Sequence, residues 1–343
     1  MRQPCFKMYL LTLITKTFHF LPEEIAHNLA LAGIRITYST GILKVLLGKK
    51  FKEKEIPDNS FAERTYENKL GIAAGLDKDG EYIDCLSALG VGFIEVGTVT
   101  PRQQSGNPKP RLFRNRKDKS LLNRLGFNNK GVEALVENLK KRSSTIPIGV
   151  SIGKNFDTPN VEAYKDYLFC MEKVYKYSSY IAINISSPNT EGLRELSNDE
   201  FLGDLLGLIK DKQIELSETF EYVPIFIKIS PDEEPEDLED ICKSITHYKI
   251  DGIIVSNTTL IHNEKNGYGG LSGSPLKNKA NEKLSFIKKI VGDEISIIAS
   301  GGVMSASDYL EKIDAGADLV QIYTGFIFEG PKLIHDILFT DSP

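Results

Sequence analysis

Apolar and polar positions alternate in blocks from about residue 68 to the carboxyl end of the 343-residue chain. Short runs rich in β-branched residues are followed by longer stretches that carry apolar residues at helical spacing. The short runs are almost continuously apolar, which is typical of parallel strands that are covered on both faces. Eight runs predict strands at Gly71–Gly75, Gly92–Val96, Ile148–Ile152, Tyr180–Ile185, Val223–Ile229, Gly252–Val255, Ile295–Ala299 and Asp318–Ile322.

Amphipathic stretches between these runs predict an equal number of helices. Strand and helix alternating eight times indicates a (β/α)8 TIM barrel, here assigned to residues 49–343, with a doubly wound open sheet as the alternative. Residues 98–127 are polar and are expected to form an irregular insert. The predicted helices are Asp84–Leu89, Gly131–Lys140, Tyr164–Tyr177, Glu200–Glu215, Glu236–His247, Asn281–Val291, Ser305–Ala315 and Pro331–Phe339.

The amino-terminal segment, residues 1–48, differs from the rest in charge and pattern. Residues 1–54 carry nine basic side chains and three acidic ones, interleaved with many apolar residues. This composition predicts amphipathic helices that contact an anionic membrane surface, with a helical cap packed on the barrel as the alternative. The apolar run at residues 8–14 is too short to span a bilayer, and no secretory cleavage site follows it.

Overall composition narrows the chemistry. The chain is 41% hydrophobic and 26% charged, as in ordinary globular proteins with a large core. Its four cysteines and five histidines are scattered without ligand spacing, so we expect neither a disulfide framework nor a metal site. A net charge of −5 without a basic stripe argues against a nucleic acid partner.

Polar side chains follow several predicted strands at the end where TIM barrels carry their active sites. The fourth strand leads into Asn184, Ser187 and Asn189, whose amides and hydroxyl could orient a flat polar ring. Alternatively, these side chains form a turn by bonding their own backbone.

Charged and glycine-rich positions at the strand ends add to this pattern. Lys228 interrupts an apolar strand, and Lys78 follows the first strand. Each needs an anion or acceptor nearby unless its ammonium group reaches solvent. Glycines after the last two strands could hold a phosphate through backbone N–H groups, although glycines also serve simply to turn the chain.

Five runs of the sequence resemble the quinone-dependent, membrane-associated class of dihydroorotate dehydrogenases, and the similarity extends from about residue 22 over nearly the whole chain. The runs are 71–80, 95–101, 123–129, 183–190 and 319–323. The resemblance implies an FMN enzyme that oxidises (S)-dihydroorotate to orotate in pyrimidine biosynthesis and passes the electrons to a membrane quinone. Ser187 stands at the position of the catalytic base, where the soluble class has cysteine.

The resemblance also implies roles for individual residues. The substrate would contact Lys78, Asn123, Arg124, Leu125, Gly126, Phe127, Asn184, Asn189, Asn257 and Thr258. FMN would contact Ala74, Gly75, Leu76, Asp77, Lys78, Thr98, Ser151, Asn184, Lys228, Ser256, Gly273, Gly302, Tyr323 and Thr324. A quinone tunnel would include His27, Arg114 and Tyr323, and residues 190–198 would form a lid.

Some positions depart from the family pattern. Ser151 replaces the usual asparagine, which puts one FMN contact in doubt, and the segment before the first strand is short, which suggests a trimmed barrel floor. We expect a monomeric peripheral protein on the cytoplasmic side of a bacterial inner membrane. The alternatives are a soluble-class flavin dehydrogenase, a flavin-free sugar-phosphate lyase or aldolase, and a flavin reductase of tRNA.

Overall fold

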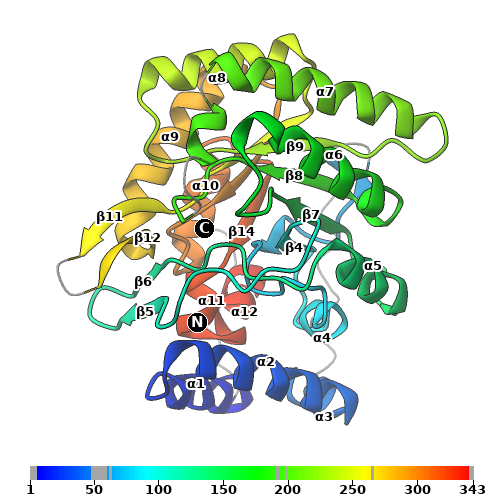
Figure 1. The fold of residues 1–343 in the computed structure, drawn as a ribbon. Helices are drawn as coiled ribbons and strands as arrows, with labels where there is room; N and C mark the ends of the chain where they lie inside the picture. Colours follow the sequence, from blue (N-terminus) through cyan, green and yellow to red (C-terminus); the bar gives the residue numbers. More distant parts are fainter. Residues whose placement is uncertain are drawn as a thin grey trace.

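The structure, a computed structural model, describes residues 6–47, 60–61, 64–189, 193–197, 199–263 and 266–339. Eight parallel strands close into a barrel in the order β10-β13-β14-β3-β4-β7-β8-β9 (Figure 1). The predicted strands are therefore confirmed, and the sheet is closed and not open. The strands are β3 (Leu70–Ile72), β4 (Phe93–Val99), β7 (Ile148–Ile152), β8 (Tyr180–Asn184), β9 (Ile225–Lys228), β10 (Gly252–Val255), β13 (Ser296–Ser300) and β14 (Leu319–Ile322).

Helices surround the barrel and bury their apolar faces against it. In α5, for example, Val132, Leu135, Val136 and Leu139 are all buried, at the spacing of one helix face. The predicted helices are all present, and a short helix, α11 (Thr324–Glu329), follows β14. The outer helices are α4 (Ile83–Ser87), α5 (Val132–Lys141), α6 (Ala163–Val174), α7 (Asp199–Ser217), α8 (Pro235–His247), α9 (Lys277–Val291), α10 (Ala306–Asp314) and α12 (Pro331–Phe339).

Three glycines make room for three aromatic rings at the bottom of the barrel interior. Each glycine lies opposite an aromatic residue of the neighbouring strand, and a Cβ atom added to it would fall 2.0–2.3 Å from that ring. Because such distances are far below van der Waals contact, only glycine fits. The pairs are Gly71 with Phe93, Gly149 with Tyr180, and Gly252 with Phe226.

The floor of the barrel is closed from below by a short hairpin, β1 (Ser60–Phe61) and β2 (Arg64–Thr65). The Phe61 ring stacks on Phe226 at a centroid distance of 5.6 Å, and Tyr66 meets Phe93 edge to face at 5.8 Å. The short segment before β3 therefore still supplies two aromatic rings, Phe61 and Tyr66, that close the floor of the barrel.

A second sheet lies beside the barrel mouth and corrects one expectation. Residues 98–127 are not simply irregular, because β5 (Leu112–Asn115) and β6 (Ser120–Asn123) form a hairpin within them. This hairpin joins β11 (Thr259–Asn263) and β12 (Gly267–Gly273) in an antiparallel sheet of order β11-β12-β6-β5. Arginine, asparagine and glycine in these strands break the apolar alternation that marks a strand in sequence.

Three amino-terminal helices form a layer of their own: α1 (Phe6–Phe18), α2 (Glu23–Ser39) and α3 (Ile42–Leu47). In Figure 1 this blue layer lies below α11 and α12, and α2 also contacts α4 and β5. No helix in the described part of the chain is long and apolar enough to cross a membrane. The expected domain boundary between residues 48 and 49 falls outside the described residues.

The glycine and aromatic pairs generate a prediction. Gly149→Ala should lower the free energy of unfolding by about 1–3 kcal/mol or more, because its Cβ would overlap the Tyr180 ring. Gly33→Ala in α2 is the control, since nothing lies within 4 Å of the added atom. It should be neutral or stabilising by about 0.5–1 kcal/mol. Urea denaturation of both variants makes the comparison, and equal stabilities would contradict the packing argument.

Candidate active site

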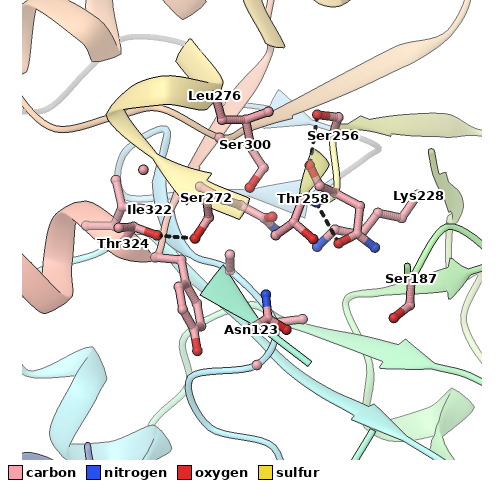
Figure 2. A pocket seen from close by; sticks show the side chains of 18 of the residues that line it. Asn123, Ser187, Lys228, Ser256, Thr258, Ser272, Leu276, Ser300, Ile322 and Thr324 are labelled. Carbon is pink, nitrogen blue, oxygen red and sulfur yellow. Dashed lines mark hydrogen bonds between the residues drawn. The ribbon is translucent and has the colours of Figure 1, made fainter. Parts of the chain in front are cut away.

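One cavity lies at the carboxyl ends of the barrel strands, and side chains from many of them point into it (Figure 2). The cavity has a volume of about 990 Å³, which includes the space at its open mouth. The predicted residues that line it are Ala74, Gly75, Lys78, Thr98, Asn123, Leu125, Gly126, Phe127, Asn184, Ser187, Asn189, Lys228, Ser256, Asn257, Thr258, Gly273, Gly302, Tyr323 and Thr324.

A chain of amides and hydroxyls crosses the floor of this cavity. Asn184, the last residue of β8, donates from Nδ2 to Thr98 Oγ1 at 2.9 Å and accepts from Asn257 Nδ2 at 3.2 Å. Thr98 Oγ1 lies 2.8 Å from Ser151 Oγ, which is fully buried. These bonds fix the orientation of the amides, so the cavity presents a preorganised set of donors and acceptors. Among the described residues, the Ser151 hydroxyl is connected to these amides through Thr98.

A second group of polar side chains surrounds Ser187, which is 6% exposed. Its Oγ accepts the backbone N–H of Asn189 at 3.3 Å, and Asn189 Nδ2 donates to Asn123 Oδ1 at 2.9 Å. Asn123 in turn donates from Nδ2 to the carbonyl of Gly270 at 3.1 Å. The hydroxyl and both amides are thus held at one side of the cavity by the loop after β8 and by the antiparallel sheet.

Lys228 is held by a carboxylate inside the barrel. Its Nζ lies 3.5 Å from Glu95 Oε1, and the Glu95 side chain is completely buried. Glu95 Oε2 accepts hydrogen bonds from Tyr180 at 2.8 Å and from Gln321 Nε2 at 2.6 Å. Burial, together with the Glu95 carboxylate, raises the pKa of Tyr180 well above its usual value, so its hydroxyl remains a donor. The lysine sits at the cavity surface with its counterion beneath it.

Lys78 approaches the cavity from the loop after β3. Its ammonium group donates to Asn128 Oδ1 at 2.7 Å. Burial lowers the pKa of Lys78 to about 8, and the nearby Arg111 acts in the same direction. The charge of Lys78 is therefore sensitive to pH just above neutrality.

Four predicted contact residues do not line the cavity. Arg124 points away, donating to the carbonyls of Pro110 and Asn266. The Asp77 carboxylate accepts the backbone N–H groups of Glu81 and Tyr82 at 2.9 and 2.7 Å, and burial raises its pKa to about 7. Leu76 faces a different cavity, and Ser151 lies beneath Thr98. Of the expected lid, residues 190–192 and 198 lie outside the described residues.

That second cavity lies between the amino-terminal helices and the barrel. Most of its walls are apolar, and it includes His27 and Arg114 of the predicted quinone tunnel. Burial lowers the pKa of His27 to about 4, so the imidazole is neutral at pH 7. Tyr323 lines the first cavity and packs on Leu112 and Leu121, which line the second. The Tyr323 side chain therefore lies between the two cavities.

Sequence reasoning missed two inward-facing polar residues, Glu95 and Gln321. Both interrupt apolar strands, which is the same signal that singled out Lys228. Ser272 and Ser300 also line the cavity, and Ser272 is hydrogen-bonded to Thr324 at 2.8 Å (Figure 2). Ser300 directly follows the predicted strand Ile295–Ala299, whereas Ser272 lies in a glycine-rich stretch that gave no strand signal.

The cavity residues fit a polar, planar and phosphorylated ligand. Thr258 Oγ1 and Gln321 Oε1 are buried without a hydrogen-bond partner among the described residues, and both residues line the cavity. Gly301 and Gly302 adopt φ values of +104° and +80°, a conformation that exposes backbone N–H groups and excludes side chains. The first turn of α11 supplies further N–H groups that have no partner within the helix. A phosphate group suits this set of donors.

The closed barrel and the polar cavity at its carboxyl face define a TIM-barrel enzyme. Residues 58–339 match the family model for dihydroorotate dehydrogenase. The chain is 50% identical to the dihydroorotate dehydrogenase (quinone) of Shewanella sediminis (strain HAW-EB3), over 94% of this chain and 95% of that protein. It is 49% identical to the protein of the same name from Aliivibrio salmonicida (strain LFI1238), over 93% of this chain and 96% of that protein.

A solved structure gives the same result. The structure of DHODH from Eimeria tenella in complex with ferulenol superimposes with a TM-score of 0.82 and 32% sequence identity. The match covers 92% of this chain and 89% of that chain. The chain therefore belongs to the dihydroorotate dehydrogenase family, whose members are flavin-dependent enzymes.

The buried ion pair generates a prediction about stability. Lys228→Met should lower the free energy of unfolding by about 3–5 kcal/mol, because it leaves the Glu95 carboxylate buried without its cation. Adding Glu95→Gln should restore most of the loss, since the remaining amide carries no charge. Chemical denaturation without added flavin makes the comparison. A double variant as unstable as Lys228→Met would show that the unpaired carboxylate is not the cause.

Proposed function

We propose that this protein binds FMN in the barrel cavity, oxidises (S)-dihydroorotate to orotate there and passes the electrons to a quinone in the second cavity. The observation that carries the proposal is the convergence of Lys78, Asn184, Ser187 and Lys228 on one cavity, with an apolar cavity next to it. The similar quinone-dependent enzymes support both the substrate and the acceptor.

Recognition of the substrate would depend on amides and one ammonium group. Asn123, Asn184, Asn189 and Asn257 can satisfy the ring amides of dihydroorotate, since each amide offers both donor and acceptor atoms. Lys78 is placed to pair with the carboxylate. A sugar-phosphate lyase would have no use for four amides at this position.

The chemical step needs a base, and Ser187 is the proposed one. FMN supplies an acceptor for two electrons when it is bound. Ser187 takes the proton from the substrate carbon next to the one that loses the hydride, and the loop after β8 positions its hydroxyl. Lys228 faces the same cavity and would stabilise negative charge that develops there during reduction. Its pairing with Glu95 keeps the cation at the cavity surface.

FMN would be held by groups from several strands. Thr98, Asn184 and Lys228 would contact the ring, while Gly273, Gly302 and Thr324 surround the end of the cavity that suits a phosphate. Ser256, Gly75 and Ala74 complete the walls. Ser151 would act indirectly, by orienting Thr98.

The amino-terminal helices would provide the route to the acceptor. The neutral His27 and the largely apolar walls suit an uncharged quinone head and tail. Ile25, Leu29, Ile36 and Val45 are 49–67% exposed and are carried by α2 and α3. Such residues favour a peripheral position on a membrane. We place the protein, as a monomer, on the cytoplasmic side of a bacterial inner membrane.

Anaerobic titration tests the proposal. Dihydroorotate should bleach the flavin absorbance of the wild-type protein, and a soluble quinone analogue should restore it. Ser187→Ala should retain the flavin spectrum but reduce the rate of bleaching by about 10²–10⁴-fold, the usual contribution of a positioned base. Normal bleaching in that variant would remove Ser187 from the mechanism. A flavin that dihydroorotate cannot bleach in wild-type protein would reject the function itself.

The pKa of Lys78 predicts a pH dependence of binding. Lys78 carries its charge below pH 8 and loses it above, so the anionic product orotate should bind more weakly as pH rises. With a pKa of about 8, orotate affinity should be roughly tenfold lower at pH 9 than at pH 7. Spectral titration of the bound flavin with orotate measures this. An affinity that stays constant across that range would separate Lys78 from the carboxylate.

A further inference from the structure

Arg111 is a buried arginine that connects the amino-terminal helices to the cavity mouth. It precedes β5 and is only 6% exposed. Its Nε donates to Glu24 Oε1 in α2 at 2.9 Å. Its Nη1 donates to the carbonyls of Ser105 and Asn107 at 2.5 and 3.0 Å. One guanidinium group therefore joins α2 to the turn at residues 105–107.

This turn holds two segments of the proposed substrate site. The backbone N–H of Asn107 donates to the carbonyl of Leu125 at 3.1 Å, and its Nδ2 donates to the carbonyl of Asn189 at 3.2 Å. Gly106 has a φ of +70°, and a Cβ there would lie 2.2 Å from the Leu125 carbonyl oxygen. The turn is therefore packed tightly against the segment that carries Leu125 and against the loop that carries Ser187 and Asn189.

Glu24 supplies the charge that keeps Arg111 in place. Burial alone would raise the pKa of Glu24, but hydrogen bonds from Arg111 and Lys109 outweigh it and lower the pKa below its usual value. The carboxylate is thus ionised at neutral pH. Lys109 binds the other oxygen, Oε2, at 3.2 Å, but its side chain is 66% exposed and, within the described part of the chain, makes no hydrogen bond to the turn. Of the two cations, only Arg111 connects Glu24 to the substrate side.

We infer that Glu24 and Arg111 are positioning residues for the substrate site, so that helix α2 shapes dihydroorotate binding as well as one wall of the acceptor cavity. The inference rests on the proposed function. The connection runs from Glu24 through Arg111 to Asn107, and from Asn107 to the loop of Ser187 and Asn189. Loss of the Glu24 charge would remove the anchor of the guanidinium on α2 and loosen the turn that braces this loop.

The test compares Glu24→Gln with wild type in the full-length, flavin-loaded protein, using orotate as the probe. The orotate Kd, measured from the flavin spectrum, should rise roughly three- to tenfold, as is usual for coupling through packed side chains. The KM for dihydroorotate should rise by a similar factor, with kcat at saturation within about twofold of wild type. Lys109→Gln is the matched control, because it removes a cation from the same carboxylate. It should leave the orotate Kd within about twofold.

A second pair of variants keeps the inference testable if Glu24→Gln folds poorly. Asn107→Ala removes the hydrogen bond to Asn189 and leaves the Glu24 and Arg111 pair intact, so it should also raise the orotate Kd. Combining the two substitutions should raise the Kd by less than the product of the single effects, because both act through one connection. Arg111→Lys keeps the charge but cannot span both partners, so it should resemble Glu24→Gln.

The outcomes separate this inference from the proposed function. Wild-type protein that does not respond to orotate would reject the function. An orotate response in wild type that Glu24→Gln leaves unchanged would reject only the inference. An equal rise of the orotate Kd in Glu24→Gln and Lys109→Gln would also reject it, since the effect of Lys109 cannot run through Arg111 and the turn. Independent, multiplicative effects of Glu24→Gln and Asn107→Ala would show that the two residues are not connected.

Discussion

The available volume inside the barrel is the constraint on which the rest of the structure depends. Eight closed strands leave an interior that side chains must fill in layers. At the bottom, glycines on three strands admit the rings of Phe93, Tyr180 and Phe226, and Phe61 seals them from below. Because rings fill this layer, the polar side chains at the next inward-facing positions of the strands lie closer to the mouth of the barrel. Packing at the floor therefore decides where the polar layer begins.

The polar layer is linked to the floor by one side chain. The Tyr180 ring belongs to the aromatic layer, while its hydroxyl donates to Glu95 in the layer above. Glu95 balances Lys228, and Gln321 shares the same carboxylate oxygen with Tyr180. A lysine in an apolar strand is thus possible because its counterion is buried with it. The charge that the cavity presents therefore depends on Glu95 and Tyr180, which do not line it.

The sequence allowed much of this to be predicted, and the failures have physical causes. Continuous apolar runs located all eight strands, and polar residues at their ends located Asn184, Ser187 and Lys228, because parallel strands bring those ends together. The antiparallel sheet at the mouth was missed, since its two hairpins lack the apolar alternation of strands and are joined through β12 and β6, which are distant in sequence. Arg124 was assigned to the cavity by the family resemblance, but acceptors at Pro110 and Asn266 draw it away.

Helix α2 lines the apolar cavity and is connected to the barrel cavity through Arg111, and its geometry explains how it can affect each of them. Glu24 and His27 are three residues apart, so they lie on the same side of the helix one turn from each other. His27 lines the apolar cavity, whereas Glu24 holds Arg111 and through it the turn at residues 105–107. A rigid helix cannot move one of these side chains without the other. Exposed Ile25 and Leu29 belong to the same helix, so a surface that contacts them and shifts α2 would act on the loop of Ser187 and Asn189 and on the apolar cavity together.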